Sequence, residues 1–387
     1  MRSAQFGLVP IALVILALPL AALTLPASPF VLLSGAEEAM EAERAVPSSE
    51  WGVPGVSSSE AGVPDPFAEL AVTPVRELPP LPGAVPIAAD SPHETAYSAR
   101  VRASFRVRVR DVVIPYRVLA VTALPGEEIV FEAEGFGGEG RPGAFRLRTE
   151  AGLHAPEAPG RWRWRAPEAP GAHAVRIESP HDGDAIHLNV LVLHPFDWIE
   201  NGAMNGYRIG TYRPAPGRDD PPEGFIEATD ELLGLRVAPG FTLGQFLCKQ
   251  EGDPPYLALS EPLLLKLEAV LEEVNAVGIE TETLFLMSAF RTPHYNRAIG
   301  NTTDGSRHLW GDAADVFIDR TGNGQMDDLT GDGRVTTADG EFLAGLVERV
   351  ERRGEAHVRP GGLSVYAANA VRGPFVHIDA RGVAARW

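Results

Sequence analysis

The sequence predicts a multidomain protein in which an all-β sandwich is followed by a domain of mixed α and β structure. Two patterns carry this prediction: short strand candidates separated by turn residues over 98–200, and helical periodicity after residue 234. A chain of 387 residues has room for two or three domains of ordinary size. With 44% hydrophobic and 22% charged residues, the composition is that of globular domains that bury a core.

Residues 1–36 are typical of a signal peptide or a membrane anchor. Arg2 precedes a stretch without charge, and residues 6–25 form an apolar run about as long as a membrane-spanning helix, roughly 20 residues. The run is long for a cleaved signal, and no clear cleavage site precedes Pro26, which slightly favours an uncleaved anchor in the inner membrane. Either alternative places the rest of the chain outside the cytoplasm, on the periplasm or cell-wall side. The one cysteine, Cys248, is then expected to be a buried thiol.

Residues 37–97 predict a disordered, acidic, Pro/Ala-rich linker. Such a composition buries too little apolar surface to offset the entropy cost of ordering. Proline keeps the linker extended, so it holds the later domains away from the membrane. The formal net charge of the chain is −18, and a phosphate-backbone binder needs a basic surface. Nucleic acid is therefore disfavoured as a partner.

Apolar and polar residues alternate strictly from Val101 to Val109, which predicts a half-buried strand. Further strand candidates lie at 113–122, 128–134, 144–149, 161–165, 173–179 and 186–193. Seven short strands at this spacing are typical of an immunoglobulin-like sandwich, although the Cys–Trp–Cys pattern of antibody domains is absent from the sequence. The arginines of the first strand are interpreted as a solvated face, with an acidic polymer as the less favoured ligand.

A junction over 201–234, rich in Gly and Pro, leads into an α+β domain over 235–387. The spacing of leucine and valine from Glu261 to Val277 predicts a helix with one apolar stripe. A short apolar run from Leu284 to Met287 predicts a buried strand.

Two histidines and one aspartate of this domain are candidate metal ligands: His308, Asp315 and His377. Asp315 begins a strand-like run and His377 lies in another, so adjacent strands can direct these side chains at one point. Zn²⁺ binds imidazole nitrogen and carboxylate oxygen, and a catalytic zinc keeps one position for water. By spacing alone, structural histidines are an equally good interpretation.

Three segments resemble the zinc D-alanyl-D-alanine carboxypeptidase and murein endopeptidase family, whose fold also underlies the hedgehog signalling domain. Residues 306–315 match S-x-H-x-x-G-x-A-x-D at all five fixed positions, and residues 376–379 match a late V-H-x-D. Residues 288–293 are similar to the family segment S-G-[YF]-R-[ST]-P. The resemblance covers about residues 235–387 and implies an α+β zinc peptidase domain with His308, Asp315 and His377 as zinc ligands.

The resemblance also implies an activity and a substrate. Zinc would activate a water molecule that hydrolyses peptide bonds in the stem peptides or crosslinks of peptidoglycan, by D,D-carboxypeptidase or murein endopeptidase action. Arg291 is similar to the family arginine that contacts a carboxylate or carbonyl oxygen of the substrate and helps to stabilise the oxyanion. Ser306 and Tyr295 are further candidates for substrate binding.

The general base is where this chain departs from the family. Many members carry glutamate three residues before the last ligand, and this chain has Pro374 there. Asp379 is the preferred substitute, because strand alternation puts its side chain on the same face as that of His377. A carboxylate that orients a ligand is the alternative role for Asp379, and Asp312 and His294 are weaker candidates for the base.

An insertion at 319–340 contains two Asp/Gly-rich segments that resemble EF-hand loops, and the second resembles half of a dockerin repeat. Oxygen ligands at alternate positions can wrap Ca²⁺, and glycine at the sixth position permits the sharp turn. The candidate calcium ligands are Asp319 and Asn323 in the first segment, and Asp328, Thr330, Asp332, the Arg334 carbonyl and Asp339 in the second. A helix from Gly340 to Arg352 is expected to follow. A plain turn cluster is the alternative, and calcium here would be structural rather than catalytic.

Three functions follow, in order of preference. The first is a zinc-dependent metallopeptidase acting on peptidoglycan. The second is a non-catalytic zinc module that binds cell-wall peptide or a protein partner, which the missing glutamate keeps open. The third is a calcium-dependent adhesion or scaffold protein that works through its sandwich. The oligomeric state stays open.

Overall fold

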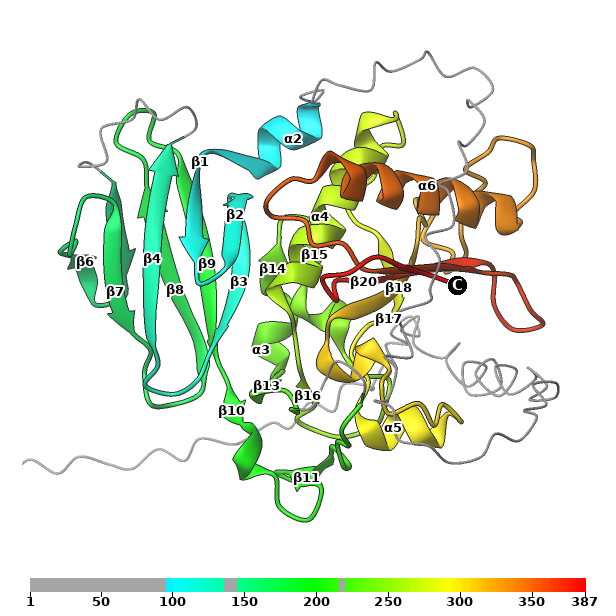
Figure 1. Ribbon diagram of the computed structural model, residues 1–387, viewed down its shortest axis with the longest axis horizontal. Coiled ribbons are helices and arrows are strands. Elements are labelled where there is room, and N and C mark those ends of the chain that lie inside the picture. Colours follow the sequence, from blue (N-terminus) through cyan, green and yellow to red (C-terminus); the bar gives the residue numbers. More distant parts are fainter. Residues whose placement is uncertain (1–94, 136–144, 216–219) are drawn as a thin grey trace, which may run out of the picture.

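The computed structural model describes residues 95–135, 145–215 and 220–387. The expected leader with its anchor at 6–25, and nearly all of the acidic linker, lie outside the described residues. Within those described ranges, none of the helices combines the length and the apolar character that crossing a bilayer requires. Figure 1 shows two lobes side by side, with the first strands of the chain in one lobe and the helix α4 (Glu261–Ala276) in the other.

The first lobe consists of two sheets, with strand orders β2-β1-β4-β7 and β3-β9-β8-β5-β6. Their strands are β1 (Arg102–Val109), β2 (Val112–Tyr116), β3 (Val118–Ala123), β4 (Glu128–Gly135), β5 (Arg146–Thr149), β6 (Gly152–His154), β7 (Arg161–Arg165), β8 (Gly171–Glu178) and β9 (Ala185–Val192). Alternate residues of both sheets are buried and belong to one hydrophobic core, which includes Phe105 and Phe131 from the first sheet and Leu188 from the second. The alternation read from the sequence thus separates the core face from the solvent face.

Six of the seven strand predictions are confirmed within two residues at each end. The candidate at 113–122 is wrong as a single strand, because the chain changes from one sheet to the other at Arg117. The guanidinium group of Arg117 donates to both carboxylate oxygens of Asp184, at 2.8 and 3.0 Å, which holds the bend. This contact spans 67 residues, so local alternation contains no sign of it. The immunoglobulin-like type of the two sheets stays a prediction.

The predicted linker is too long by three residues. Thr95 caps helix α2 (Ala96–Val101), its hydroxyl accepting the Ser98 N–H at 3.0 Å. Tyr97 is buried, and its hydroxyl donates to Glu268 of α4 at 2.7 Å. These tertiary contacts order residues whose composition alone favours disorder.

The exposed face of the first sheet carries the arginines that the sequence places on one strand face. Of these, Arg106 and Arg108 contact Glu134 of β4, at 2.9 and 3.8 Å, whereas Arg102 contacts Glu272 of α4. Exposed pairs of this kind contribute little to stability. They do reduce the net positive charge of the face, and this favours the solvated-face interpretation over binding of an acidic polymer.

The predicted junction contains regular structure and packs into the second lobe. Its elements are β11 (Ala203–Met204), β12 (Tyr207–Arg208), β13 (Gly224–Glu227) and α3 (Asp230–Leu233). Strand β13 pairs with β10 (His194–Pro195) and β16 (Tyr256–Leu257). Tyr212 donates its hydroxyl proton to the Leu309 carbonyl at 2.6 Å, which joins the junction to the segment of the candidate ligands.

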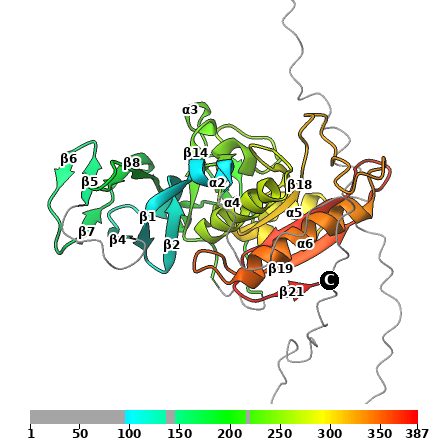
Figure 2. The same ribbon diagram turned by 90° about the horizontal axis from the view of Figure 1, so that it is seen from above.

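The second lobe is built on a five-stranded sheet of order β17-β18-β20-β19-β21. Its strands are β17 (Phe285–Ser288), β18 (Ala313–Phe317), β19 (Gly362–Tyr366), β20 (Phe375–Asp379) and β21 (Ala385–Arg386). Helix α6 (Thr337–Arg353) packs on β19 and β20, and Figure 2 shows it lying along the sheet beside α4. The remaining elements are η4 (Phe196–Trp198), β14 (Arg236–Ala238), β15 (Phe241–Thr242), η5 (Leu243–Phe246), α5 (Pro293–Ala298) and η6 (Arg307–Trp310). The predicted helices and strands of this domain are confirmed within three residues at each end. The buried character expected for the strand at 284–287 is wrong: β17 is at the edge of the sheet, Phe285 is exposed, and the other residues of β17 are half-buried.

Helix α4 differs from its prediction in burial. Twelve of its sixteen residues are buried, so the expectation of one apolar stripe is wrong. The buried charges have partners from other elements: Lys266 contacts Glu351, and Glu272 accepts two hydrogen bonds from Arg102, at 2.7 and 2.8 Å. The first lobe covers one side of α4 and α6 covers another, which explains why charged positions are enclosed.

We expect Glu268 to make stability depend on pH. Burial raises its pKa from 4.5 to about 7, although the Tyr97 hydrogen bond opposes the change. Between these pH values Glu268 is protonated in the folded chain and ionised in the unfolded chain. Glu268 therefore lowers the free energy of unfolding as pH rises from 4.5 to 7. Glu268→Gln removes this dependence. The stability of the variant relative to wild type should increase by up to about 3 kcal/mol between pH 4.5 and pH 8.

Urea denaturation in the presence of EDTA measures this difference without a contribution from bound metal. Glu282→Gln is the matched control, because Glu282 is exposed and pairs with Arg100 of α2 at 2.8 Å. A Glu268→Gln difference that stays constant across this pH range would contradict the expectation.

Candidate metal site

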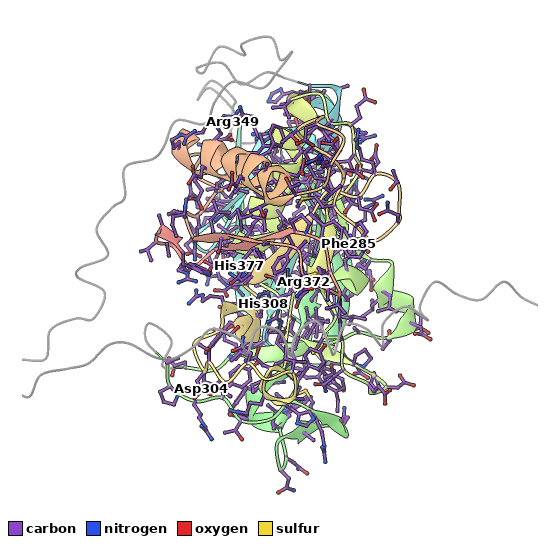
Figure 3. All side chains as sticks on the ribbon, turned by 90° about the vertical axis from the view of Figure 1, so that its right-hand side faces the viewer. Phe285, Asp304, His308, Arg349, Arg372 and His377 are labelled. Atoms are coloured by element: carbon purple, nitrogen blue, oxygen red, sulfur yellow. The ribbon has the colours of Figure 1, made fainter. Side chains whose placement is uncertain are left out.

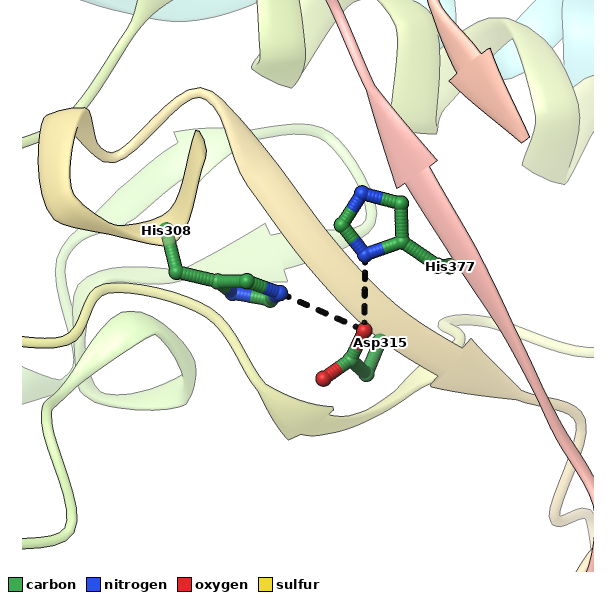
Figure 4. Close-up of side chains that lie close together, drawn as sticks. All are labelled: His308, Asp315 and His377. Atoms are coloured by element: carbon green, nitrogen blue, oxygen red, sulfur yellow. Dashed lines mark hydrogen bonds and ion pairs between the residues drawn. The ribbon is translucent and has the colours of Figure 1, made fainter. Parts of the chain in front are cut away.

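The sheet register brings two of the candidate ligands together. Asp315 of β18 and His377 of β20 are direct cross-strand partners, so both side chains lie on one face of the sheet. His308 reaches the same point from η6, just before β18. Its Nε2 lies 3.3 Å from Asp315 Oδ1, and His377 Nδ1 lies 2.9 Å from the same oxygen (Figure 4).

Small residues of the motif allow η6 to turn directly into β18. Gly311 ends η6 with φ +66°, a left-handed conformation that favours glycine. A Cβ at Gly311 would also collide with the Ala258 carbonyl. Ala313 and Ala314 are fully buried in the strand that follows. The glycine and alanines of the pattern therefore have a packing role that brings His308 over β18.

His308 is held so that one nitrogen faces the other ligands. Its Nδ1 lies 2.6 Å from the Ala289 carbonyl oxygen, to which an Nδ1–H donates. The lone pair is then on Nε2, the atom that points to Asp315. Burial, and next the charge of Arg291, lower the pKa of His308, which favours the neutral ring that a metal requires.

Arg291 holds the carboxylate of Asp315. The guanidinium group donates to Asp315 Oδ2 at 2.6 Å and to Ser288 Oγ at 2.8 Å. Burial would raise the pKa of Asp315, but His308, His377 and Arg291 hold it well below its usual range. Arg291 is 6% exposed. It therefore positions a ligand in this structure, and its contact with substrate oxygen stays a prediction.

Asp379 lies behind His377, on the side away from the other donors. Its Oδ2 is 3.4 Å from His377 Nε2, and it accepts hydrogen bonds from Gly362 N at 2.7 Å and from Arg381 at 2.5 Å. Asp379 is fully buried, and although burial would raise its pKa, the bonds from His377 and Arg381 lower it. A weakly basic, enclosed carboxylate suits the orienting role better than that of general base.

Asp379→Asn separates these two roles. If Asp379 orients His377, zinc affinity should fall about 10–100-fold, and the turnover of a zinc hydrolase should largely return at saturating zinc. A chelator competition assay gives the affinity, and turnover at excess zinc gives the second readout. Unchanged affinity together with lost turnover at saturating zinc would instead establish Asp379 as the base.

The other candidates lie in segments that precede β18. Ser306 occupies the N-cap position of η6, and Tyr295 lies in α5, and both are half-buried. Their contacts with substrate stay predictions. Asp312 is buried and paired with Arg307 at 2.5 Å, and His294 lies in α5 with its backbone N–H bonded to Ile209. Asp312 is thus engaged by a cation, which makes it a poor base.

Sequence reasoning missed three contributors to the site. A sequence motif cannot indicate the Ala289 carbonyl, because every residue has a backbone carbonyl group. Ser364 pairs with His377 across the strands, but its segment matches no pattern. Trp387 lies with its ring centroid 5.3 Å from that of His377. It follows the last matched motif by eight residues, so only the tertiary structure reveals it.

The two predicted calcium segments lie between β18 and α6, except that Asp339 lies in the first turn of α6 and is fully buried. Asp319 accepts the N–H groups of Asn323 and Gly324, and Asp328 accepts those of Gly331 and Gly333. The candidates Asp332 and Asp339 also accept backbone N–H groups, the first from Arg334 and the second from Thr330. Both segments therefore form tight turns in which the side-chain oxygens bind the backbone. Calcium binding stays a prediction.

The donor set fits zinc. Among the residues that the structure describes, one group of at least three His, Cys, Asp or Glu donors lies within 4.8 Å, and it is His308, Asp315 and His377. Two ligands of a tetrahedral zinc ion, each roughly 2.0–2.1 Å away, lie about 3.3 Å apart. The distance from His308 Nε2 to Asp315 Oδ1, 3.3 Å, equals this spacing, and that from His377 Nδ1, 2.9 Å, is shorter by 0.4 Å. Two imidazoles and one carboxylate leave a fourth position for water or substrate.

Comparisons with protein families, with curated proteins and with solved structures found no match to this chain.

Proposed function

We propose that this chain is a zinc-dependent metallopeptidase that hydrolyses peptide bonds of peptidoglycan, with an α+β zinc peptidase domain beside an immunoglobulin-like sandwich. The convergence of two nitrogens and one oxygen on one face of the sheet carries the proposal. Zinc bound there would polarise a carbonyl and lower the pKa of water to about 7.

Each donor has a second partner that prepares it for a cation. The Ala289 carbonyl keeps the His308 proton on Nδ1, and Asp379 is placed to accept the proton of His377 Nε2. Arg291 holds the far oxygen of Asp315, so that the near oxygen faces both histidines. Partners of this kind raise affinity because the ligands need not reorganise on binding. If the histidines lacked such partners, a structural role would be the better interpretation of them than a role as metal ligands.

The choice of peptidoglycan stem peptides rests on the motif resemblance and on the expected location. An apolar segment before an acidic linker is typical of a chain tethered outside the cytoplasm, where the cell wall lies. Cys248 is buried, as expected, and burial raises its pKa, so the thiol is protected in an oxidising space. Cleavage of terminal D-alanine and cleavage of crosslinks are both compatible with the donor set.

A second candidate function is a non-catalytic zinc module that binds cell-wall peptide. Two observations favour it: Pro374 stands where family members carry glutamate, and Asp379 is held by Arg381. Such a module would keep the zinc affinity that the donor set provides, and would lack turnover.

One experiment separates the candidates. The full chain with one equivalent of zinc is incubated with isolated peptidoglycan, and mass spectrometry follows released D-alanine and opened crosslinks. We expect product from wild type, none from His308→Ala, and wild-type levels from His187→Ala, an exposed histidine of β9. Zinc at unit stoichiometry without product on any wall substrate would establish the binding module. A wild-type chain that does not bind zinc would overturn both proposals.

A further inference from the structure

Lys249 lies beside the segment that holds the candidate zinc ligands, and the function proposed above gives it no role. Two neighbours fix its position. Cys248, the residue before it, is buried, and Gln250, the residue after it, accepts the hydroxyl proton of Thr292 at 2.5 Å. Thr292 directly follows Arg291 in the chain. The backbone of Lys249 is therefore anchored next to the arginine that holds Asp315.

The side chain of Lys249 reaches solvent close to the metal donors. It is exposed, whereas the side chain of Cys248 points into the core. Partial burial, and next the positive charge of Arg291, lower the pKa of Lys249, and the negative charge of Asp315 raises it. The charged groups that act on Lys249 are thus a candidate zinc ligand and its arginine. Figure 3 looks onto the side of the molecule where the labelled His308 and His377 lie.

The ammonium group of Lys249 has no anionic partner among the residues that the structure describes. Arg291, in contrast, donates to Asp315 at 2.6 Å and to Ser288 at 2.8 Å. Two positive charges near one another repel, and an anion that binds beside them reduces this repulsion. Lys249 is therefore the cation of this site that is available to a ligand.

The charged groups around the donors add up to a positive site in an acidic chain. Lys249, Arg291 and Arg381 contribute three positive charges, and Asp315 and Asp379 contribute two negative charges. One positive charge remains, and a bound Zn²⁺ would add two more. The whole chain has a formal net charge of −18. A positive site on such a chain attracts an anionic ligand to this one place.

We propose that Lys249 binds the carboxylate of the substrate residue that follows the scissile bond, an inference that rests on the proposed function. A terminal D-alanine carries its carboxylate on the carbon bonded to the scissile nitrogen. Consecutive Cα atoms are about 3.8 Å apart, so this carboxylate lies close to the carbonyl that zinc would polarise. The flexible stem and compact charge of lysine suit such a contact.

Stabilisation of the oxyanion is a less suitable role for Lys249. Charge that develops in the transition state is best stabilised by donors that are fixed beforehand. Within the described part of the chain nothing fixes the ammonium group of Lys249, whereas Arg291 is held on both sides. A mobile cation suits a charge that the substrate carries permanently. The chain then prefers peptides that end in a free carboxylate one residue beyond the bond that is cut.

A phosphinate analogue of D-alanyl-D-alanine tests this contact independently of turnover. The phosphinate group replaces the scissile amide, binds zinc and is not cleaved. Calorimetry on the full zinc-loaded chain compares the analogue that has a free carboxylate with its C-terminal amide. Wild type should bind the acid about tenfold more tightly than the amide. Lys249→Met should lose this preference, and Lys249→Arg should keep most of it.

Arg165→Met is the matched control for the loss of one positive charge. Arg165 lies in β7 of the other lobe, is 66% exposed and pairs with Glu168 at 3.3 Å. This variant should keep the wild-type preference for the acid. Unit zinc stoichiometry and an unchanged melting temperature of Lys249→Met would show that the donor set and the fold are intact.

Acetylation of lysine gives a second readout that needs no variant. The sequence contains two lysines, Lys249 and Lys266, and Lys266 is fully buried. An N-hydroxysuccinimide ester should therefore acetylate Lys249 and spare Lys266, and mass spectrometry of the peptides locates the label. The phosphinate acid should slow acetylation of Lys249 several-fold, and the amide at equal occupancy should slow it less.

Equal binding of acid and amide by wild type would overturn the proposal, as would an undiminished preference for the acid in Lys249→Met. Acetylation of Lys249 at the same rate with and without the acid would also overturn it. A preference that depends on Lys249, without hydrolysis of any wall substrate, would keep the carboxylate site and remove the catalytic proposal. Hydrolysis of peptidoglycan without a preference for the acid would do the reverse.

Discussion

Replacing Asp315 by alanine is expected to abolish zinc binding and peptide hydrolysis together. Asp315 supplies the only oxygen of the donor set, and both histidines approach its Oδ1, at 3.3 and 2.9 Å. Loss of a ligand should cost more than the 10–100-fold in affinity that outer partners contribute, so we expect a fall of more than about 100-fold. Zinc content after gel filtration and a chelator competition assay measure it.

The variant also removes the partner of a buried cation, and a control must separate the two effects. Arg291 has an 8% exposed side chain and would be left without its carboxylate. Asp312→Ala is matched in this respect, because Asp312 is 1% exposed and pairs with Arg307, whose side chain is 11% exposed. Both variants should lose stability, but only Asp315→Ala should lose zinc. Retained unit zinc in Asp315→Ala would refute the donor set.

Lys266→Met is expected to lower the free energy of unfolding by about 3–5 kcal/mol, the usual cost of breaking a buried ion pair. Lys266 is fully buried in α4, and its Nζ donates to Glu351 at 2.5 Å and to the Asp379 carbonyl at 2.6 Å. Glu351 also accepts from Arg386 of β21 at 2.6 Å. Lys266 therefore connects α4 and α6 with the strand ends that carry Asp379 and Arg386.

Chemical denaturation measures the loss, and the melting temperature should fall on the order of 10 °C. Arg349→Met is the matched control, because Arg349 lies on α6, pairs with Glu273 of α4 at 2.9 Å, and is 40% exposed. It should cost less than about 1 kcal/mol. The double variant Lys266→Met/Glu351→Gln should regain part of the loss, since it removes the buried carboxylate charge that Lys266 no longer offsets, although Arg386 still contacts it. A cost below 1 kcal/mol for Lys266→Met alone would show that this network is dispensable.

The candidate site was predictable where it depends on local pattern. His308 and Asp315 lie in one motif, and the runs around Asp315 and His377 read as strands, so their pairing was a reasonable expectation that the register bears out. The role of Asp379 was left between two alternatives, because strand alternation gives its face and not its partners. Arg381 and Gly362, which lower its basicity, become visible only in three dimensions.

Fold predictions failed where a contact with a residue far away in the sequence fixes the local conformation. Arg117 ends one strand and begins another because it binds Asp184, and Tyr97 is ordered because it reaches Glu268. Helix α4 has enclosed charges because α6 and the first lobe both pack on it. Hydrophobic periodicity reports which residues avoid water on average, and it contains no information on the element that covers them.

By itself, the sequence determined the alternation that separates core from surface, the positions of most strands and helices, and the donor types of the candidate metal site. These follow from short-range periodicity and from side-chain chemistry, and both depend only on the residue types and their order in the sequence. The tertiary structure alone decided how much of α4 is buried, which carboxylate lies behind His377, and where Trp387 lies. Those outcomes depend on contacts between segments separated by tens to hundreds of residues, and such contacts exist only once the chain has packed.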